Sequence, residues 1–293
     1  MAAETNVITS AELKKVREVD FVNQFTHASL AKLIEVLGVT RKIPMMEGST
    51  MYVYTTSGTL ASGTVAEGDV IPLSKYEQTK TAIDEIKLKK HRKAVTAEAI
   101  KKSGLETALV ETDAAMLRDI QKDIRKSFFD FLNGTIAGSS TATGVGLQAA
   151  LANAWGQLQI KFEDDTAQAV YFVNPADMAD YLGNASITMQ TAFGMNYIEN
   201  FLGLGTVIMT SQVAKGKFIA TAKENIVMYY LTMGGDVANA FELTTDETGY
   251  IGIKSGYQNE ERAQVETLVM DGINFFVEYG AGVVKGTITA EAA

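Results

Sequence analysis

The stretch GSTMYVYTTSGTLASGTVAEGDVIPLSKY, residues 48–76, decides the fold of this chain. It is rich in Thr, Ser and Gly, and Gly58, Gly63 and Gly68 recur at five-residue intervals, a spacing that breaks any helix. Its apolar residues are isolated, so the stretch has little apolar surface to bury within its own subunit. We therefore expect an extended arm that packs on another chain.

The first part of this arm has the alternation of a strand. Residues 51–56 place Met, Val and Thr on one face and Tyr, Tyr and Thr on the other. We expect the partner strand to run back through Ile83, Ile86 and Leu88 to Val95. A two-stranded hairpin alone is marginally stable in water, so a hairpin this long is expected to rest on another surface.

The arm is preceded by two different segments. Residues 1–20 are polar and charged, which predicts an arm that a neighbour orders. The segment Phe21 to Gly38 places its apolar residues near helical spacing and ends in glycine, so we expect a helix there.

Residues 107–133 predict a long amphipathic helix of about 40 Å. Its apolar stripe consists of Val110, Leu117, Ile120, Ile124, Phe128 and Phe131. Three basic residues, Arg118, Lys122 and Arg125, share another face, and Gly134 fits a left-handed cap after the last turn.

A loop of Gly, Ser and Thr, residues 134–146, then separates the helix from a second region of mixed α and β structure. There we expect a helix over 147–158 and a buried strand over 169–173. A short helix should follow, with Asn174 as its N-cap, Pro175 as its first residue and Gly183 at its end. Further strands are predicted at 206–211, 217–221, 226–231, 239–244, 265–270, 273–277 and 283–288.

Composition excludes several classes of protein. The 293 residues, with 46% hydrophobic and 21% charged residues, are typical of a globular protein. A net charge of -9 argues against tight binding of nucleic acid, so any contact with DNA should be weak and non-specific. The absence of cysteine excludes disulfides, zinc–thiolate sites and thiol catalysis. No signal peptide or membrane-spanning run is recognisable, so we expect synthesis in the cytosol.

Residues that could carry chemistry are scattered. The two histidines, His27 and His91, have no carboxylate at a ligand spacing, so no metal site is predicted. The pairs Asp164-Asp165 and Glu260-Glu261 could act as acid and base, but solvated loops explain them better. No nucleotide-binding or hydrolase motif is present, and we expect no catalytic, cofactor-binding or metal residues and no small-molecule substrate.

The basic run from Lys87 to Lys93 has two possible roles. It could be a nucleic-acid patch, but it lacks interleaved aromatic residues. An exposed strand face, or an ion-pairing face toward another subunit, is favoured.

Three stretches together carry a resemblance to a known family. They are EGDVIP at 67–72, FVNPAD at 172–177, and RAQVETLV at 262–269 followed by AGVV at 281–284. In this order, around the long hairpin and long helix, they resemble the major capsid proteins of tailed bacteriophages, which have the Hong Kong 97-type α+β fold.

The resemblance implies an organisation of the chain. It implies an N-terminal arm and helix at 1–46, an extended loop at 47–93, a peripheral domain at 94–144 and 251–293 with its spine helix at about 107–133, and an α/β axial domain at 145–250.

The resemblance also implies a function and partners. The chain would be a structural protein, not an enzyme, that self-assembles into the icosahedral shell around a phage double-stranded DNA genome. Other copies of the chain, a scaffold protein and a portal protein would be its partners, and no membrane would be involved. It would be assembled in the bacterial host cytoplasm and found in the virion.

Candidate site residues follow from the arm, the basic run and the resemblance. Some relatives crosslink their shells through a lysine at the loop tip, but no lysine lies between Lys42 and Lys75, so we expect no such crosslink. Bending between five-fold and six-fold surroundings is expected at the glycines Gly48, Gly134 and Gly144. The residues expected at contacts between subunits are Gly58, Gly63, Glu67, Gly68, Asp69, Lys87, Lys89, Arg92, Arg118, Lys122 and Arg125.

Other functions stay open at this point. The same fold would serve an encapsulin-like shell that packages a protein cargo. A soluble α/β enzyme with the glycine-rich arm as a lid is a second alternative, and a phage tail-tube or decoration protein is a third.

Overall fold

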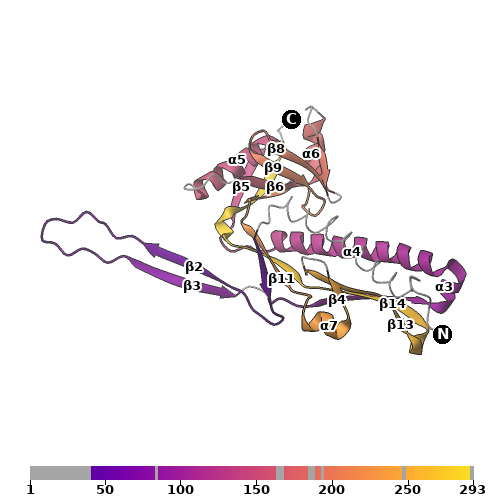
Figure 1. Ribbon diagram of the computed structural model, residues 1–293. Helices are drawn as coiled ribbons and strands as arrows, with labels where there is room; N and C mark the ends of the chain where they lie inside the picture. The colour runs from indigo at the N-terminus through magenta and orange to yellow at the C-terminus, as the bar shows by residue number, and fades with distance from the viewer. Residues whose placement is uncertain are drawn as a thin grey trace, which may run out of the picture.

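The computed structural model describes residues 41–82, 85–162, 168–183, 189–192, 195–245 and 249–290. Figure 1 shows a two-stranded arm that projects from a body in which a long helix lies along one sheet and a second sheet packs above it. The predicted N-terminal arm and the helix expected at 21–38 lie outside the described residues.

The predicted hairpin is present, but its predicted second strand is wrong. Strand β2 (Tyr52–Thr59) pairs antiparallel with β3 (Lys75–Ala82) from Tyr52 opposite Ala82 to Thr59 opposite Lys75. Strand β3 has the sequence KYEQTKTA, which carries no apolar alternation because neither face of the arm is buried in the subunit. The apolar run after it instead leads into β4 (Lys89–Thr96), which pairs with β14 (Gln264–Asp271).

The predicted long helix is confirmed as α4 (Leu105–Asn133), which begins two residues before the predicted start. It follows α3 (Ala97–Ser103), whose N-cap Thr96 accepts a hydrogen bond from the backbone N–H of Ala99. The ring of Phe128 meets those of Phe172 and Phe275 edge to face, with centroids 5.8 and 5.0 Å away. The side chains of Val110 and Leu117 are not among those described.

Two small sheets form the layer on which α4 lies (Figure 1). One has the order β12 (Thr244–Thr245), β13 (Ile251–Asn259), β14 and β4, so β4 lies at its edge. The other has the order β1 (Lys42–Met45), β11 (Ile226–Leu231) and β15 (Ile273–Val277). The strand predicted at 239–244 is wrong, because residues 236–241 form helix α7 (Asp236–Phe241).

The upper region is built on a seven-stranded sheet. Its order is β5 (Ser140–Val145), β16 (Val283–Thr289), β10 (Lys217–Ala222), β6 (Ala169–Val173), β9 (Gly205–Met209), β8 (Met195–Phe201) and β7 (Gln190–Ala192). The predicted strands at 169–173, 206–211, 217–221 and 283–288 are therefore confirmed with small shifts of their ends. Helices α5 (Gly146–Lys161) and α6 (Pro175–Leu182) pack with this sheet.

Two expectations around the end of α4 are wrong. Gly134 has φ -62 and ψ 177, which is extended backbone and not a left-handed cap. The loop expected over 134–146 contains β5, because Ser140–Val145 pairs in parallel with β16 from far along the chain. Strand β16 thus joins the sheet of the α/β region, although its residues were grouped with the peripheral domain; the domain boundaries themselves stay a prediction.

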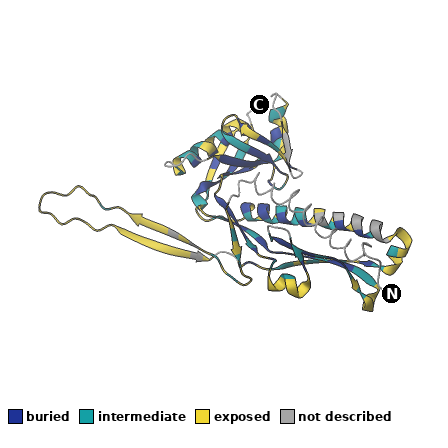
Figure 2. Ribbon diagram, in the orientation of Figure 1, coloured by how far each residue is buried: buried dark blue, intermediate teal, exposed yellow. Residues whose placement is uncertain are grey.

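One buried cluster joins the two layers of the body. It contains Phe128 and Phe129 of α4, Phe172 of β6 and Phe275 of β15. Figure 2 shows buried residues along the sheets and the inner face of α4, whereas the arm is exposed along its length. The body therefore has its own core, and the arm lies outside that core.

Candidate assembly surfaces

The tip of the arm, defined here as residues 60–74, exposes large apolar side chains. Leu60 is 77% exposed, Val70 90%, Ile71 69% and Leu73 95%. Monomeric proteins rarely leave several such residues together in water. The tip is therefore a candidate surface for contact with another chain.

Three of the predicted contact residues form the turn at the end of the tip. The backbone N–H of Asp69 donates to the carbonyl of Ala66 at 3.1 Å, and Gly68 has φ 91, a conformation that glycine adopts without strain. Glu67 and Asp69 are both exposed beside this turn. The turn therefore presents two carboxylates next to Val70 and Ile71.

Gly58 and Gly63 lie at different points of the arm. A methyl group at position 58 would lie 2.2 Å from Cδ1 of Tyr76, the residue opposite it in β3, so the ring occupies the space a side chain would need. Gly63 has no atom within 4 Å of such a methyl group. The Nζ of Lys80 lies 3.6 Å from the centre of the Tyr52 ring, a cation–π contact that ties the two strands near the root.

Gly48 lies where the arm leaves the body. The backbone N–H of Ser49 donates to the carbonyl of Met46 at 3.1 Å, and Gly48 takes φ 78 in this turn. The position matches that expected for a hinge at the root of the arm, and the bending itself stays a prediction.

The other two predicted hinges have defined packing partners. The carbonyl of Gly134 accepts a hydrogen bond from Nζ of Lys285 in β16. Burial lowers the pKa of Lys285. A methyl group at Gly144 would lie 2.3 Å from the backbone nitrogen of Ala150, because β5 crosses close to α5. Close backbone approach explains glycine at position 144 without bending.

The basic run is divided between the two faces of the edge strand β4. Lys89 and Lys93 face α4, where their Nζ atoms lie 2.9 Å from Asp123 and 2.5 Å from Asp113. Arg92 faces the other side, 3.7 Å from the carboxylate of Glu266. Lys87 is exposed before the strand. Lys89 and Arg92 thus have ion-pair partners within the subunit, and their predicted role between subunits stays a prediction.

Among the residues that the structure describes, three buried carboxylates were not predicted from the sequence: Asp113, Glu266 and Asp271. Glu266 accepts hydrogen bonds from the hydroxyl of Tyr257 at 2.5 Å and from Nδ2 of Asn259 at 2.9 Å, and these bonds lower the pKa of Glu266. Burial, together with Glu266, raises the pKa of Tyr257 to about 12. An acidic residue inside the apolar run 265–270 was the signal that could have predicted a buried polar cluster.

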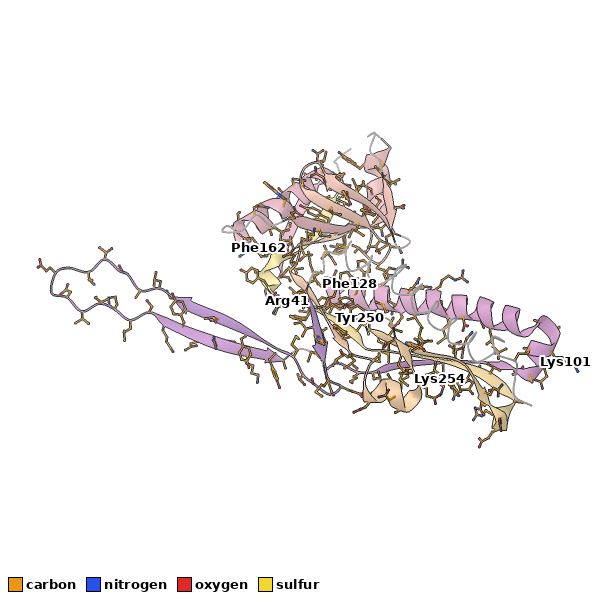
Figure 3. All side chains as sticks on the ribbon, viewed as in Figure 1. Arg41, Lys101, Phe128, Phe162, Tyr250 and Lys254 are labelled. Atoms are coloured by element: carbon orange, nitrogen blue, oxygen red, sulfur yellow. The ribbon has the colours of Figure 1, made fainter. Side chains whose placement is uncertain are left out.

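The predicted basic face of α4 is present. Arg118 and Lys122 are exposed and Arg125 is half-buried. The structure does not bring these residues together with the arm, which projects from the body away from α4 (Figure 1). The labelled Lys101, in α3, marks the end of the body farthest from the arm in Figure 3.

The described residues offer little for catalysis. No group of three or more His, Cys, Asp or Glu within the described ranges could hold a metal ion. The Glu260-Glu261 pair lies in an exposed single-turn helix (Glu260–Arg262), and Asp164-Asp165 lies outside the described residues. No helix in the described part of the chain is long and apolar enough to cross a membrane.

An arm of exposed strands, a long helix on a sheet and a separate α/β layer are the parts of the Hong Kong 97-type fold, and solved structures with this fold align with the chain. The capsid of an empty GTA particle aligns with a TM-score of 0.58 at 10% identity, covering 89% of this chain and 90% of that one. A chain from Microbacterium phage Oxtober96 aligns with a TM-score of 0.54 at 13% identity, covering 87% and 90% of the two chains.

An encapsulin complex from Synechococcus elongatus is also similar, with a TM-score of 0.52 at 11% identity over 97% of this chain and 96% of the encapsulin. No protein-family model and no curated protein sequence matches the chain. The structural likenesses confirm the predicted α+β capsid fold.

Proposed function

We propose that this chain is the major capsid protein of a tailed bacteriophage, many copies of which assemble into an icosahedral shell around a double-stranded DNA genome. The observation that carries the proposal is the arm: its tip exposes Leu60, Val70, Ile71 and Leu73, and it projects away from the body that could have covered them. The capsid fold of the rest of the chain supports the same reading.

The proposed role is mechanical and not enzymatic. A tip that binds a different surface on the next copy makes a heterologous contact, and such contacts close into rings or shells when their rotations close. Permanent assemblies of this kind bury upwards of about 2,000 Å² per interface. Because no lysine lies between Lys42 and Lys75, the tip is expected to hold its place without a lysine crosslink.

Partners and location follow from this role. We expect a scaffold protein and a portal protein as assembly partners, and weak contact with DNA because the net charge is -9. The chain would be a component of the virion, assembled in the host cytoplasm.

Electron microscopy of the purified full-length protein tests the proposal. Closed particles are expected from the wild type, and a deletion of residues 58–68 is expected to leave a folded subunit that forms none. Normal particles from the deletion variant would contradict the role proposed for the arm. A wild-type chain that stays monomeric would contradict the proposal as a whole.

An encapsulin-like shell is the second candidate, and the similarity to the encapsulin from Synechococcus elongatus favours it specifically. Purified particles decide between the two candidates by their contents. Packaged double-stranded DNA supports the capsid, and a protein cargo without DNA supports the encapsulin-like shell.

A further inference from the structure

Three connections carry the chain between the two layers of the body in the described part of the sequence. Residues 134–139 lead from α4 to β5 of the upper sheet. Residues 223–225 lead from β10 of the upper sheet to β11 of the lower layer, and residues 278–282 lead from β15 back to β16. We call residues 223–225 and 278–282 together the layer joint.

The side chain of Asn225 ties the two halves of the layer joint to each other. Asn225 is 6% exposed, its Nδ2 donates to the carbonyl of Tyr279 at 3.0 Å, and its Oδ1 accepts from the backbone N–H of Tyr279 at 2.9 Å. The same Nδ2 donates to Oγ1 of Thr221 in β10 at 3.2 Å. The backbone carbonyl of Asn225 also accepts from the N–H of Glu278 at 2.9 Å. One buried amide therefore bonds to the end of β10 and to the connection that leads to β16.

The layer joint is held from both layers at adjacent residues. The ring of Phe162, at the end of α5, meets the ring of Tyr279 edge to face with centroids 5.6 Å apart. The Nη1 atom of Arg41, just before β1, lies 2.5 Å from Oε1 of Glu278. Figure 3 shows Phe162 on the side of α5 and Arg41 on the side of the lower layer.

The connection from α4 to β5 packs against the same place. A methyl group at Gly280 would overlap the carbonyl oxygen of Ala137, so the backbones of two connections are in contact there. The carbonyl of Gly134, at the end of α4, accepts a hydrogen bond from Nζ of Lys285 in β16. All three connections are therefore held together at the layer joint.

The hydrogen bonds of Asn225 restrict orientation in a way that the shared core does not. The aromatic cluster around Phe128 joins the layers by apolar contact, and the hydrophobic effect has no preferred direction. Hydrogen bonds weaken steeply when their angles depart from linear. A buried polar group with all its bonds made also favours a single arrangement of its surroundings. Asn225 is therefore well placed to hold one angle between the layers.

We propose that Asn225 fixes the angle between the two layers of the subunit and thereby sets the curvature of the shell. This inference rests on the proposed function, because curvature is a property of many copies together. Head-to-tail contacts close into a shell only when the rotation from copy to copy has the right value. A change in the angle between the layers changes that rotation wherever the upper sheet and the lower layer contact different neighbours.

The first test removes the amide of Asn225 in the full-length chain. Asn225→Ala is expected to widen the spread of particle diameters in electron micrographs by about twofold or more, with open or tubular forms among the products. The matched control is Asn174→Ala. Its side chain bonds the N–H of Ala176 and the carbonyl of Val213, both within the upper region, so the diameters should stay those of the wild type.

A second variant covers the case in which Asn225→Ala does not fold. Thr221→Val keeps the shape of a side chain that is 1% exposed and removes one acceptor of the Asn225 amide. It should widen the diameters in the same direction by a smaller amount. Thr210→Val is its control, because Thr210 is also buried and its Oγ1 accepts from the N–H of Gln212 within the upper region.

Spin labels measure the angle between the layers directly, because the chain has no cysteine of its own. Ile160→Cys on α5 and Lys126→Cys on α4 place labels at two exposed side chains, one on each layer. Labelled chains are diluted into unlabelled chains, so that electron paramagnetic resonance reports distances within one copy. Adding Asn225→Ala should widen the distance distribution about twofold, and adding Asn174→Ala should leave it unchanged.

The outcomes separate this inference from the proposed function. Unchanged label distances in Asn225→Ala, or equal widening in Asn174→Ala, would overturn the role of Asn225 while wild-type particles still form. Wider label distances with unchanged particle diameters would overturn the link from Asn225 to curvature. A wild-type chain that forms no particles would contradict the proposed function, and the label distances would still decide whether Asn225 fixes the angle.

Discussion

The Nε2 atom of His91 in β4 lies 3.4 Å from the carboxylate of Asp271 in β14, a side chain that is 1% exposed. The interaction with Asp271 is the largest cause that raises the pKa of His91 above 6.5, and Asp123 of α4 raises it further. Burial and Lys89 act in the opposite direction. A titratable pair therefore joins the edge strand β4 to its neighbour β14.

The sign of the resulting pH dependence is fixed by the raised pKa. The pair stabilises the folded chain fully below about pH 6.5, where His91 is charged in both states, and this stabilisation is lost as pH rises through the higher folded pKa. We expect the free energy of unfolding to fall as pH rises from about 6.5 through the folded pKa of His91. The His91→Gln variant should show a smaller change of unfolding free energy with pH. Urea unfolding at several pH values measures this free energy for both proteins.

The control for this prediction changes no titratable group. Ile160→Ser on α5, whose side chain is 73% exposed, should keep the wild-type dependence on pH. An unchanged slope in His91→Gln, or an NMR titration that gives His91 a pKa at or below 6.5, would contradict the prediction.

The pair of Lys93 and Asp113 is expected to matter more than any surface ion pair. Lys93→Ala removes the ammonium group that lies 2.5 Å from the carboxylate of Asp113, a side chain of a residue only 6% exposed, and should cost about 3–5 kcal/mol of unfolding free energy. The double variant Lys93→Met with Asp113→Leu should recover most of this loss, because apolar residues replace a buried ion pair well.

The control for Lys93 is an ion pair on the surface of α4. The Nζ atom of Lys126 lies 3.3 Å from Oδ2 of Asp130, and both side chains are more than half exposed. Lys126→Ala should cost about 0.5 kcal/mol or less by the same denaturant measurement. Equal costs for the two lysines would show that burial does not strengthen the inner pair.

Gly286→Ala should destabilise the seven-stranded sheet. Gly286 lies opposite Phe218, and a methyl group there would be 1.9 Å from Cζ of the Phe218 ring. Overpacking of this kind typically costs about 1–3 kcal/mol, to be measured as a lower midpoint of urea unfolding.

Gly156→Ala is the matched substitution in an open position. Nothing lies within 4 Å of a methyl group at this position inside α5, so alanine should stabilise the chain by about 0.5–1 kcal/mol. The prediction for Gly286 fails if its alanine variant is as stable as the wild type.

Polar substitution of the tip should separate folding from assembly. Val70→Ser with Leu73→Ser changes side chains that are 90% and 95% exposed, so the unfolding free energy of the subunit should change by less than about 0.5 kcal/mol. Particle yield, measured by electron microscopy and sedimentation, should fall at least tenfold. Ile160→Ser on α5 is the control, and an equal loss from both would show that the tip has no special role.

Many elements of the fold could be predicted because they depend on local sequence patterns. The period of the apolar stripe predicted α4, and Asn174 accepts a hydrogen bond from Ala176 as the predicted N-cap of α6. Where the pattern was ambiguous, the prediction failed: residues 239–244 were predicted as a strand, yet helix α7 (Asp236–Phe241) occupies half of them.

The candidate contact residues were only partly predictable. The arm residues were found because a Gly-rich polar segment with no internal partner is visible in sequence. The partners of Lys89, His91 and Lys93 were not, because Asp123, Asp113 and Asp271 come from elements far along the chain.

The sequence by itself determined that the arm cannot bury itself and that residues 107–133 form one helix, since composition and helical period act within a few turns of chain. Only the tertiary structure decided that β3 is the partner of β2, that β16 closes the upper sheet against β5 and β10, and that Asn225 binds the backbone of Tyr279. Those features arise from pairing between segments that are distant in the chain. Local sequence favours several such pairings about equally, and the burial of apolar surface in the whole folded chain selects one of them.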